Sequence, residues 1–250
     1  MSTIAIIPVS GVPEVSPGDH LDALLLDAID RLRVGLKNGD VLVVCQKIVS
    51  KAQGRIVDLK TVAPSAFAQR IGAQWDKDPR LVEVVLRESR RIVRMKDGVV
   101  ISETGPGWVC ANAGVDTSNS PGDDIVVLLP QDADGAAREL RTAIMERRGV
   151  EVAVVVTDTF GRPWREGLVE FALGVAGLDP LLDLRGNPDR QGMELRHTVV
   201  AVADELASAA GLVMEKGAGI PAVIVRGYKH RPHPGGAHKL IRPPDKDLFR

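Results

Sequence analysis

Aromatic residues are scarce in this chain of 250 residues, because Phe, Trp and Tyr together make up only 3%. So few rings cannot build the stacking platform on which proteins hold single-stranded nucleic acids. An excess of one charge is also missing, since 32 Lys and Arg residues balance 33 Asp and Glu residues to a net charge of −1. A near-neutral chain lacks the basic surface that non-specific nucleic-acid binding needs. We therefore expect no nucleic-acid partner.

Long hydrophobic runs and cysteines are equally rare. No apolar run approaches the length of about 18 residues that a transmembrane helix requires, so we expect no membrane partner. Residues 1–4 lack the basic-then-apolar pattern of a signal peptide, which makes the cytoplasm the expected location. Two cysteines, Cys45 and Cys110, cannot form a disulfide framework or a thiolate metal site. Each follows an apolar stretch, and we interpret both as small core residues.

The sequence is rich in short β-branched runs separated by amphipathic helical patterns. The runs predict strands at residues 4–9, 40–45, 98–101, 125–129, 150–156 and 222–225. The helical patterns cover residues 19–36, 78–94, 134–147 and 202–214, and the proline-rich residues 231–244 predict an ordered loop or an arm. The fold class expected is α/β or α+β with mixed sheets. We expect a single domain over residues 1–250, with a smaller helical and strand subdomain around residues 60–100.

No P-loop motif is present, but three polar segments interrupt the apolar strands. The first covers residues 46–55, where Lys47, Lys51 and Arg55 recur every four residues. This spacing would place three cations on one helical face, which suits phosphate binding. A solvated turn with surface lysines is the alternative interpretation.

The second segment, residues 111–119, consists mostly of small residues around Asp116. Small residues let the backbone approach a ligand closely, and the Asp116 carboxylate is an oxygen ligand of the kind that hard cations prefer. Taken alone, the same segment is also compatible with an Asx turn.

The third segment, residues 154–167, is the most informative. An apolar strand delivers Asp158 and Thr159 at its carboxyl end, the usual ligand position of an α/β sheet, and both side chains suit Mg²⁺ or Mn²⁺. Arg162 and Arg165 add guanidinium groups for a phosphate or a carboxylate, so we predict catalytic roles for Asp158, Arg162 and Arg165. The three segments together predict phosphoryl transfer from a nucleotide.

These segments, together with the opening and the close of the chain, resemble the coenzyme F-420-0:L-glutamate ligase family, also called F-420 gamma-glutamyl ligases. The resemblance runs in order along nearly the whole chain, and it rests on residues 7–14, 39–44, 49–55, 114–119, 157–165 and 247–249. It implies an unusual ligase fold that forms an intertwined homodimer. It further implies a GTP-dependent enzyme that joins L-glutamate to the lactyl carboxylate of coenzyme F-420-0 through an acyl phosphate and then adds a γ-linked glutamate.

The resemblance also implies roles for individual residues. The expected nucleotide-binding residues are Val12, Pro13, Glu14, Val15, Gln46, Lys51 and Asn119, with Lys51 on the phosphates. Asp116, Asp158 and Thr159 match metal ligands for one or two Mg²⁺ or Mn²⁺ ions, and a monovalent cation such as K⁺ is a further candidate. Lys216 stands where some relatives offer a glutamine to a second metal, which leaves the number of metal ions open.

Two other functions fit the same residues. One is a metal-dependent, nucleotide-using ligase or phosphotransferase that acts on another carboxylate. The other is a non-catalytic module in which the polar segments only hold a deazaflavin or a nucleotide.

Overall fold

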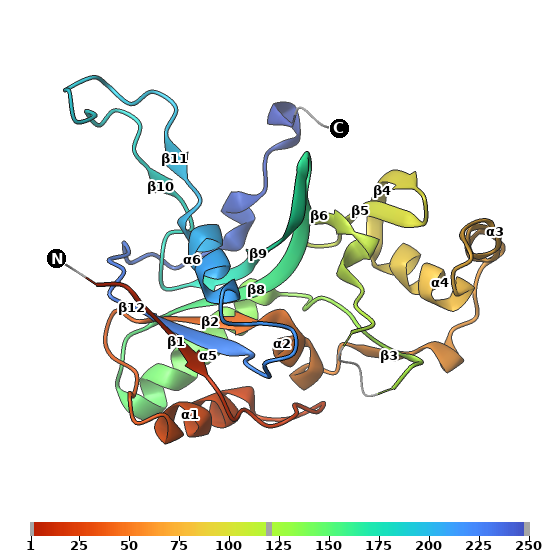
Figure 1. Ribbon diagram of the computed structural model, residues 1–250, viewed down its shortest axis with the longest axis horizontal. Coiled ribbons are helices and arrows are strands. Elements are labelled where there is room, and N and C mark those ends of the chain that lie inside the picture. Colours follow the sequence, from red (N-terminus) through yellow and green to blue (C-terminus); the bar gives the residue numbers. More distant parts are fainter. Residues whose placement is uncertain (1–2, 119–121, 248–250) are drawn as a thin grey trace.

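A five-stranded mixed sheet forms the centre of the computed structural model, which describes residues 3–118 and 122–247 (Figure 1). In spatial order the strands are β1 (Ala5–Val9), β12 (Ala222–Arg226), β2 (Val41–Cys45), β8 (Ala153–Arg162) and β9 (Arg165–Ala176). Only β2 and β8 run parallel, and the other neighbours are antiparallel. The expectation of a mixed α and β protein is confirmed.

Helices cover both faces of this sheet, which explains why β2 and the first four residues of β8 are continuous apolar runs. On one face, Leu42 and Val44 pack against α1 (Leu21–Arg31), α2 (Gln46–Ala52) and α5 (Ala133–Arg148). On the other face, Val41 and Val43 pack against α6 (Val202–Gly211). The layers are visible in Figure 1, where α1 and α5 lie below the sheet and α6 lies above it.

The first turn of α5 lies directly against β9. A Cβ atom on Gly174 of β9 would fall 2.1 Å from the carbonyl oxygen of Ala133, so only glycine allows this approach. Asp132 caps the helix by accepting a hydrogen bond from the amide of Gly135, at 2.7 Å. The helix therefore begins at a fixed distance from the edge strand of the sheet.

A smaller group of elements lies to one side of the sheet, on the right in Figure 1. It contains two helices and a three-stranded sheet: α3 (Ala66–Trp75), α4 (Pro79–Glu88), β4 (Ser89–Lys96), β5 (Val99–Thr104) and β6 (Val109–Ala111). The antiparallel pair β3 (Ile56–Asp58) and β7 (Ile125–Val127) lies where the chain enters and leaves this group. Separate small apolar clusters hold it together.

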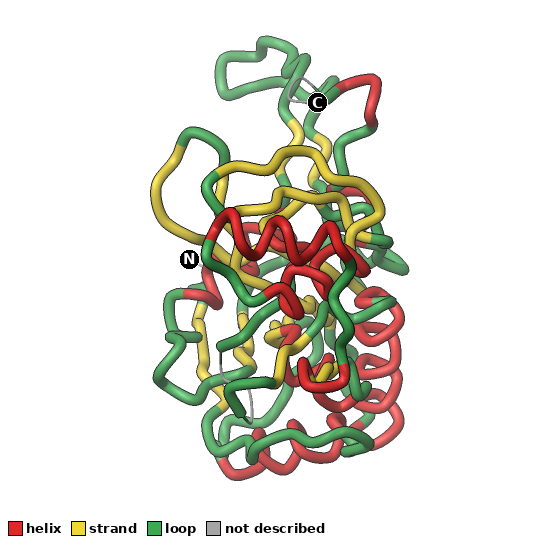
Figure 2. The backbone as a smooth tube through the Cα atoms, turned by 90° about the vertical axis from the view of Figure 1, so that its right-hand side faces the viewer, coloured by secondary structure: helices red, strands yellow, loops and turns green. Residues whose placement is uncertain are grey.

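Two further segments lie around α6. The short strands β10 (Leu182–Asp183) and β11 (Val199–Val200) pair at the base of a segment that extends beyond the sheets in both views (Figure 1, Figure 2). Residues 231–244 are an ordered loop, as predicted, because Ala237 is fully buried in the apolar cluster under α6. No helix among the described residues is long and apolar enough to cross a membrane.

Three predicted elements differ from those observed. The helix predicted for residues 78–94 is wrong beyond Glu88, because the next residues form β4 and pair with β5. The helix predicted for residues 19–36 ends at Arg31, since Arg33 and Gly35 adopt positive φ angles of 57° and 53°. The strand predicted for residues 150–156 begins at Ala153 and continues to Arg162, where it turns back as β9.

Candidate functional site

A cavity of about 580 Å³ opens where the parallel strands β2 and β8 end. Its wall contains residues from the loop before α1, from α2, from the segment after β6, from the β8–β9 hairpin and from the loop before β12. The carboxyl end of parallel strands is the usual ligand position in α/β sheets. Five segments that are distant in sequence thus meet at one place.

The acidic side of the cavity unites the three predicted metal ligands. Asp116, Asp158 and Thr159 all line it, although more than forty residues separate the first from the other two. Within residues 3–118 and 122–247, no group of three or more His, Cys, Asp and Glu side chains lies close enough to hold a metal ion by itself. Two carboxylates and a hydroxyl fit Mg²⁺ or Mn²⁺, which keep waters and phosphate oxygens among their ligands.

The environment of Asp158 disfavours its negative charge. Burial raises the pKa of this carboxyl to about 7, and the neighbouring carboxylates of Glu170 and Asp116 add to the rise. A divalent cation would relieve this repulsion and favour the ionised form, so the residues present fit such an ion. Its place on this wall of the cavity stays a prediction.

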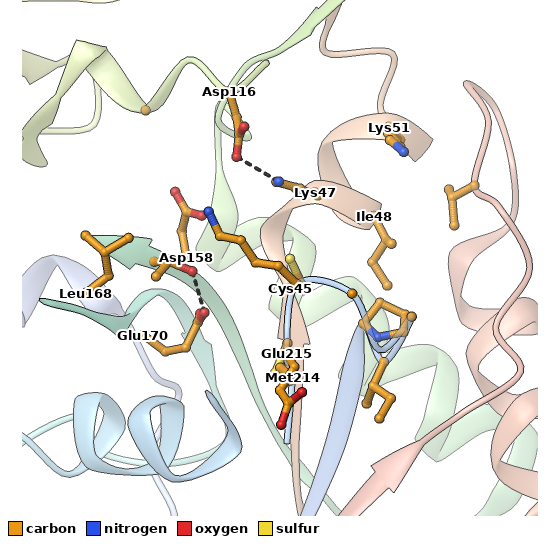
Figure 3. Close-up of a pocket in the computed structure, with 18 of the residues that line it drawn as sticks. Cys45, Lys47, Ile48, Lys51, Asp116, Asp158, Leu168, Glu170, Met214 and Glu215 are labelled. Atoms are coloured by element: carbon orange, nitrogen blue, oxygen red, sulfur yellow. Dashed lines mark hydrogen bonds and ion pairs between the residues drawn. The ribbon is translucent and has the colours of Figure 1, made fainter. Parts of the chain in front are cut away.

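Asp116 is held by a cation of the protein itself (Figure 3). Lys47 Nζ lies 2.8 Å from Asp116 Oδ2, and the amide of Ser118 donates to Asp116 Oδ1 at 2.6 Å. Burial alone would raise the pKa of Asp116, but the hydrogen bonds from Lys47 and Ser118 outweigh it and hold the pKa below its usual range.

The opposite side of the cavity contains the predicted nucleotide-binding residues of the loop before α1. Val12, Pro13, Glu14 and Val15 line it together with Lys51. Lys51 is buried, with 5% of its surface exposed, and its ammonium contacts the carboxylate of the exposed residue Glu14. The cations of residues 46–55 do not form one face, because Arg55 lies beyond the end of α2 and pairs with Glu88 at 2.6 Å.

Four other predicted site residues do not line the cavity or lie outside the described residues. Arg162 and Arg165 face each other across the turn of the β8–β9 hairpin, and Arg162 Nη2 donates to the carbonyl of Glu166 at 3.1 Å. Gln46 is fully buried, and its Oε1 accepts from Ser50 Oγ at 2.8 Å. Asn119 lies outside the described residues.

Comparison with known proteins decides the family. The sequence profile of F420-0:Gamma-glutamyl ligase matches residues 11–227. The chain belongs to this family. The matched part includes every segment that lines the cavity, from Val12 to Pro221.

Archaeal relatives match the chain over nearly its whole length. The coenzyme F420:L-glutamate ligase of Methanothermobacter thermautotrophicus is 46% identical over 250 residues, which cover 99% of each chain. The protein of the same name from Methanopyrus kandleri is 46% identical over 255 residues, covering 100% of this chain and 99% of its own. The one from Haloarcula marismortui is 43% identical over 252 residues, covering 98% and 95%.

One carboxylate that lines the cavity of this gamma-glutamyl ligase family member was not considered in the sequence analysis. Glu170 of β9 accepts a hydrogen bond from Thr159 Oγ1 at 2.5 Å and lies beside Asp158 (Figure 3). The sequence offered one signal for this residue, because Glu170 is the single charged residue in an apolar stretch that includes Leu168, Val169 and Phe171.

The prediction that the cysteines are small core residues is confirmed for Cys110 and not for Cys45. Cys110 is buried, and Cys45 is partly buried at the end of β2, where it lines the cavity. Burial raises the pKa of each thiol to about 12, so both stay neutral and unreactive at ordinary pH.

Proposed function

We propose that this chain is a GTP-dependent ligase that adds L-glutamate to the lactyl carboxylate of coenzyme F-420-0 and then adds a further γ-linked glutamate. The family membership and the names of the archaeal relatives support the ligase activity and its substrates. The observation that carries the proposal is the meeting of Asp116, Asp158 and Thr159 with Lys51 and the loop before α1 in one cavity.

The proposed chemistry has two steps. A carboxylate oxygen of the coenzyme attacks the γ-phosphorus of GTP, the bond to the β,γ-bridging oxygen breaks, and GDP leaves. The neutral amine of glutamate then attacks the acyl carbon, an amide bond forms, and inorganic phosphate leaves with the electrons of the broken C–O bond. Before attack, the glutamate ammonium gives one proton to solvent, and the second N–H proton is lost as the amide forms.

The residues of this chain would bind and orient these groups. Val12, Pro13 and Val15 offer apolar surface to the guanosine, and Lys51 offers a buried positive charge to a phosphate. Asp116, Asp158 and Thr159 would hold Mg²⁺ or Mn²⁺, which supplies positive charge against the phosphate oxygens. A second divalent ion and a K⁺ ion remain part of the proposal.

Arg162 and Arg165 would act from the turn of the β8–β9 hairpin. Arg165 is exposed, and a guanidinium group there is free to approach a carboxylate of a bound substrate. Gln46 and Asn119 keep their proposed nucleotide contacts. Buried Gln46 can reach a nucleotide only through a change of its surroundings, because its Oε1 is bonded to Ser50.

A homodimer in the cytoplasm completes the proposal. The intertwined assembly rests on the family resemblance.

The test is a mass-spectrometric analysis of the products formed from coenzyme F-420-0, L-glutamate, GTP and Mn²⁺. We expect mass increases of one and then two glutamate residues, with release of GDP and phosphate only when both acceptor and glutamate are present. Turnover with a different carboxylate would indicate another ligase. Binding of the coenzyme and GTP without any product would indicate a non-catalytic module.

A further inference from the structure

Glu170 joins two threonines of the neighbouring strand. Its Oε1 accepts from Thr159 Oγ1 at 2.5 Å, and its Oε2 lies 2.8 Å from Thr157 Oγ1. Thr157 and Thr159 flank Asp158, and Glu170 lies directly opposite Thr159 in the register of β8 and β9. One carboxylate thus holds the hydroxyls on both sides of Asp158. We call Thr157, Thr159 and Glu170 the threonine clamp.

The clamp lies where the backbone ladder is irregular. The register between β8 and β9 shifts after Val156, which pairs with Gly174, because Thr157 then pairs with Ala172. A bulge of this kind re-aims side chains and interrupts the regular pairing of the strands. Side-chain hydrogen bonds therefore fix the local geometry of β8 at the residue before Asp158.

Helix α6 supports Glu170 from behind. Ser208 Oγ donates to the carbonyl oxygen of Glu170 at 2.9 Å. Gly211 lies against the Cβ and Cγ atoms of Glu170, where a larger residue would not fit. A Cβ atom on Gly211 would lie 2.7 Å from Glu170 Cγ, too close for any real contact. Helix α6 thus holds the backbone of Glu170, and Gly211 leaves room for the Glu170 stem.

The direction of the hydrogen bond has a chemical consequence for Thr159. A hydroxyl has one proton and two lone pairs, and Thr159 directs its proton toward Glu170. The lone pairs of its oxygen are then free for a cation in the cavity that Thr159 lines. Removal of a partner that orients a metal ligand in this way typically weakens metal binding by about 10–100-fold.

We propose that Glu170 is a positioning residue, which acts through the threonine clamp to hold Thr159 and Asp158 in the arrangement that binds a divalent cation. The purpose of the clamp rests on the proposed function, but its existence as a local constraint does not.

The decisive comparison is between Glu170→Ala and Glu170→Gln. Alanine removes both hydrogen-bond acceptors. Glutamine keeps an amide oxygen that can accept from Thr159, and its NH₂ group can donate to Thr157 Oγ1. Thr157 can then donate its own proton to the carbonyl oxygen of Phe171, at 2.9 Å. The exposed residue Glu166 of the same strand provides the matched control, because Glu166→Gln removes the same charge without touching the clamp.

Two measurements on these proteins test the proposal. The first is hydrogen exchange of the amides of residues 157–160 in metal-free protein. The second is the affinity for Mn²⁺ alone, followed by the electron paramagnetic resonance signal of the free ion. We expect Glu170→Ala to exchange faster and to bind Mn²⁺ about 10–100-fold more weakly. Glu170→Gln should stay within about threefold of the unsubstituted protein, and Glu166→Gln should equal it.

Gly211→Ala supplies the same test without changing the carboxylate. Its new methyl group should displace Glu170, so we expect faster exchange at residues 157–160 and weaker Mn²⁺ binding. This variant replaces Glu170→Ala if that protein does not fold.

Two results would overturn the proposal. Equal losses in Glu170→Gln and Glu170→Ala would show that the negative charge matters and the clamp does not. Unchanged hydrogen exchange and Mn²⁺ affinity in Glu170→Ala or Gly211→Ala would show that the clamp does not position Thr159 and Asp158. A failure of the proposed function is distinct, because it would appear as missing glutamylated product in the unsubstituted protein while the variants still differ in exchange.

Discussion

Lys47 and Asp116 connect the central sheet to the smaller group of elements beside it. Lys47 Nζ lies 2.8 Å from Asp116 Oδ2 and 2.7 Å from Ser118 Oγ, so α2 is tied to the segment that follows β6. The side chain of Lys47 is 14% exposed, and that of Asp116 is 28% exposed. The same carboxylate is a proposed metal ligand, which means that a lysine and a divalent cation would share it.

Replacing Lys47 tests how much the ion pair with Asp116 contributes to stability. We expect Lys47→Met to lower the free energy of unfolding by about 1–3 kcal/mol, because Asp116 would lose a charged hydrogen-bond donor in a partly buried place. Urea unfolding at neutral pH measures the change. Lys60→Met is the matched control, since Lys60 pairs with Asp124 at 3.3 Å and is 70% exposed, and it should change stability by less than about 0.5 kcal/mol. Equal effects of the two substitutions would contradict the prediction.

Lys51 should act on the nucleotide. We expect Lys51→Ala to raise the KM for GTP by about 10–100-fold, since one charge-assisted hydrogen bond contributes about 1.5–3 kcal/mol. Lys60→Ala is the control, because it removes the same charge from an exposed lysine that does not line the cavity. The KM of that variant should not rise. Normal GTP kinetics in a well-folded Lys51→Ala protein would refute the role of this lysine.

Asp158 should be essential for turnover. We expect Asp158→Asn to fold normally and to lose about a hundredfold or more in kcat, because the amide cannot supply the negative charge that holds a divalent cation. Raising Mn²⁺ should restore part of the rate. A lowered thermal midpoint combined with a nearly normal kcat would instead indicate that Asp158 only stabilises the local structure of β8.

The same substitution should change how stability depends on pH in metal-free protein. The pKa of the Asp158 carboxyl is about 7 in the folded protein, compared with 3.8 for an unperturbed aspartate such as that of the unfolded chain. Between about pH 4 and pH 7 the folded protein therefore retains a proton that the unfolded chain has lost. The contribution of Asp158 to stability therefore falls as pH rises from about 4 to 7. The stability of Asp158→Asn minus that of the unsubstituted protein should therefore be more favourable at pH 8 than at pH 4. Thermal unfolding with a chelator present measures this, and parallel pH profiles would contradict it.

The oligomeric state is a separate prediction. We expect a homodimer, and light scattering should give twice the chain mass of 26.8 kDa at working concentrations. A fully active protein with the mass of one chain would exclude the intertwined assembly.

Arg165 tests the catalytic role of the hairpin turn. Arg165 is exposed, so Arg165→Ala should leave the thermal midpoint unchanged, while kcat should fall about tenfold or more if the guanidinium stabilises charge during the reaction. Unchanged kcat would place Arg165 outside the reaction.

The sequence predicted the elements whose signal is local. The valine runs of β2 and β8 are buried on both faces, and their composition alone indicates strands. The boundary between α4 and β4 was missed, because residues 89–94 continue a helical pattern of charges and the strand exists only through pairing with β5. Strand β9 was missed for a similar reason, since its first half is exposed and is ordered by β8.

The site was predictable to the extent that it lies in continuous motifs. Asp116, Asp158, Thr159 and Lys51 were predicted because each lies in a polar segment next to an apolar strand, and all four line the cavity. Glu170 was not found, because its partners depend on a hairpin register that includes a bulge. The burial of Gln46 was also not predictable, since α2 begins directly at the end of β2 with no turn between them.

The strand order of the central sheet has a consequence for how the chain folds during its synthesis. Strand β2, at residues 41–45, has β8 on one side and β12 on the other, and β12 reaches residue 226. Pairings between such distant segments close slowly, since a long loop must be ordered before any contact forms. The hairpin of β8 and β9 can pair as soon as it leaves the ribosome, and β2 can then pair with β8. Strand β1 and the other edge of β2 must wait for β12, near the end of the chain. Until then these apolar strand edges are open to other chains, and the newly made protein is most exposed to aggregation at this stage.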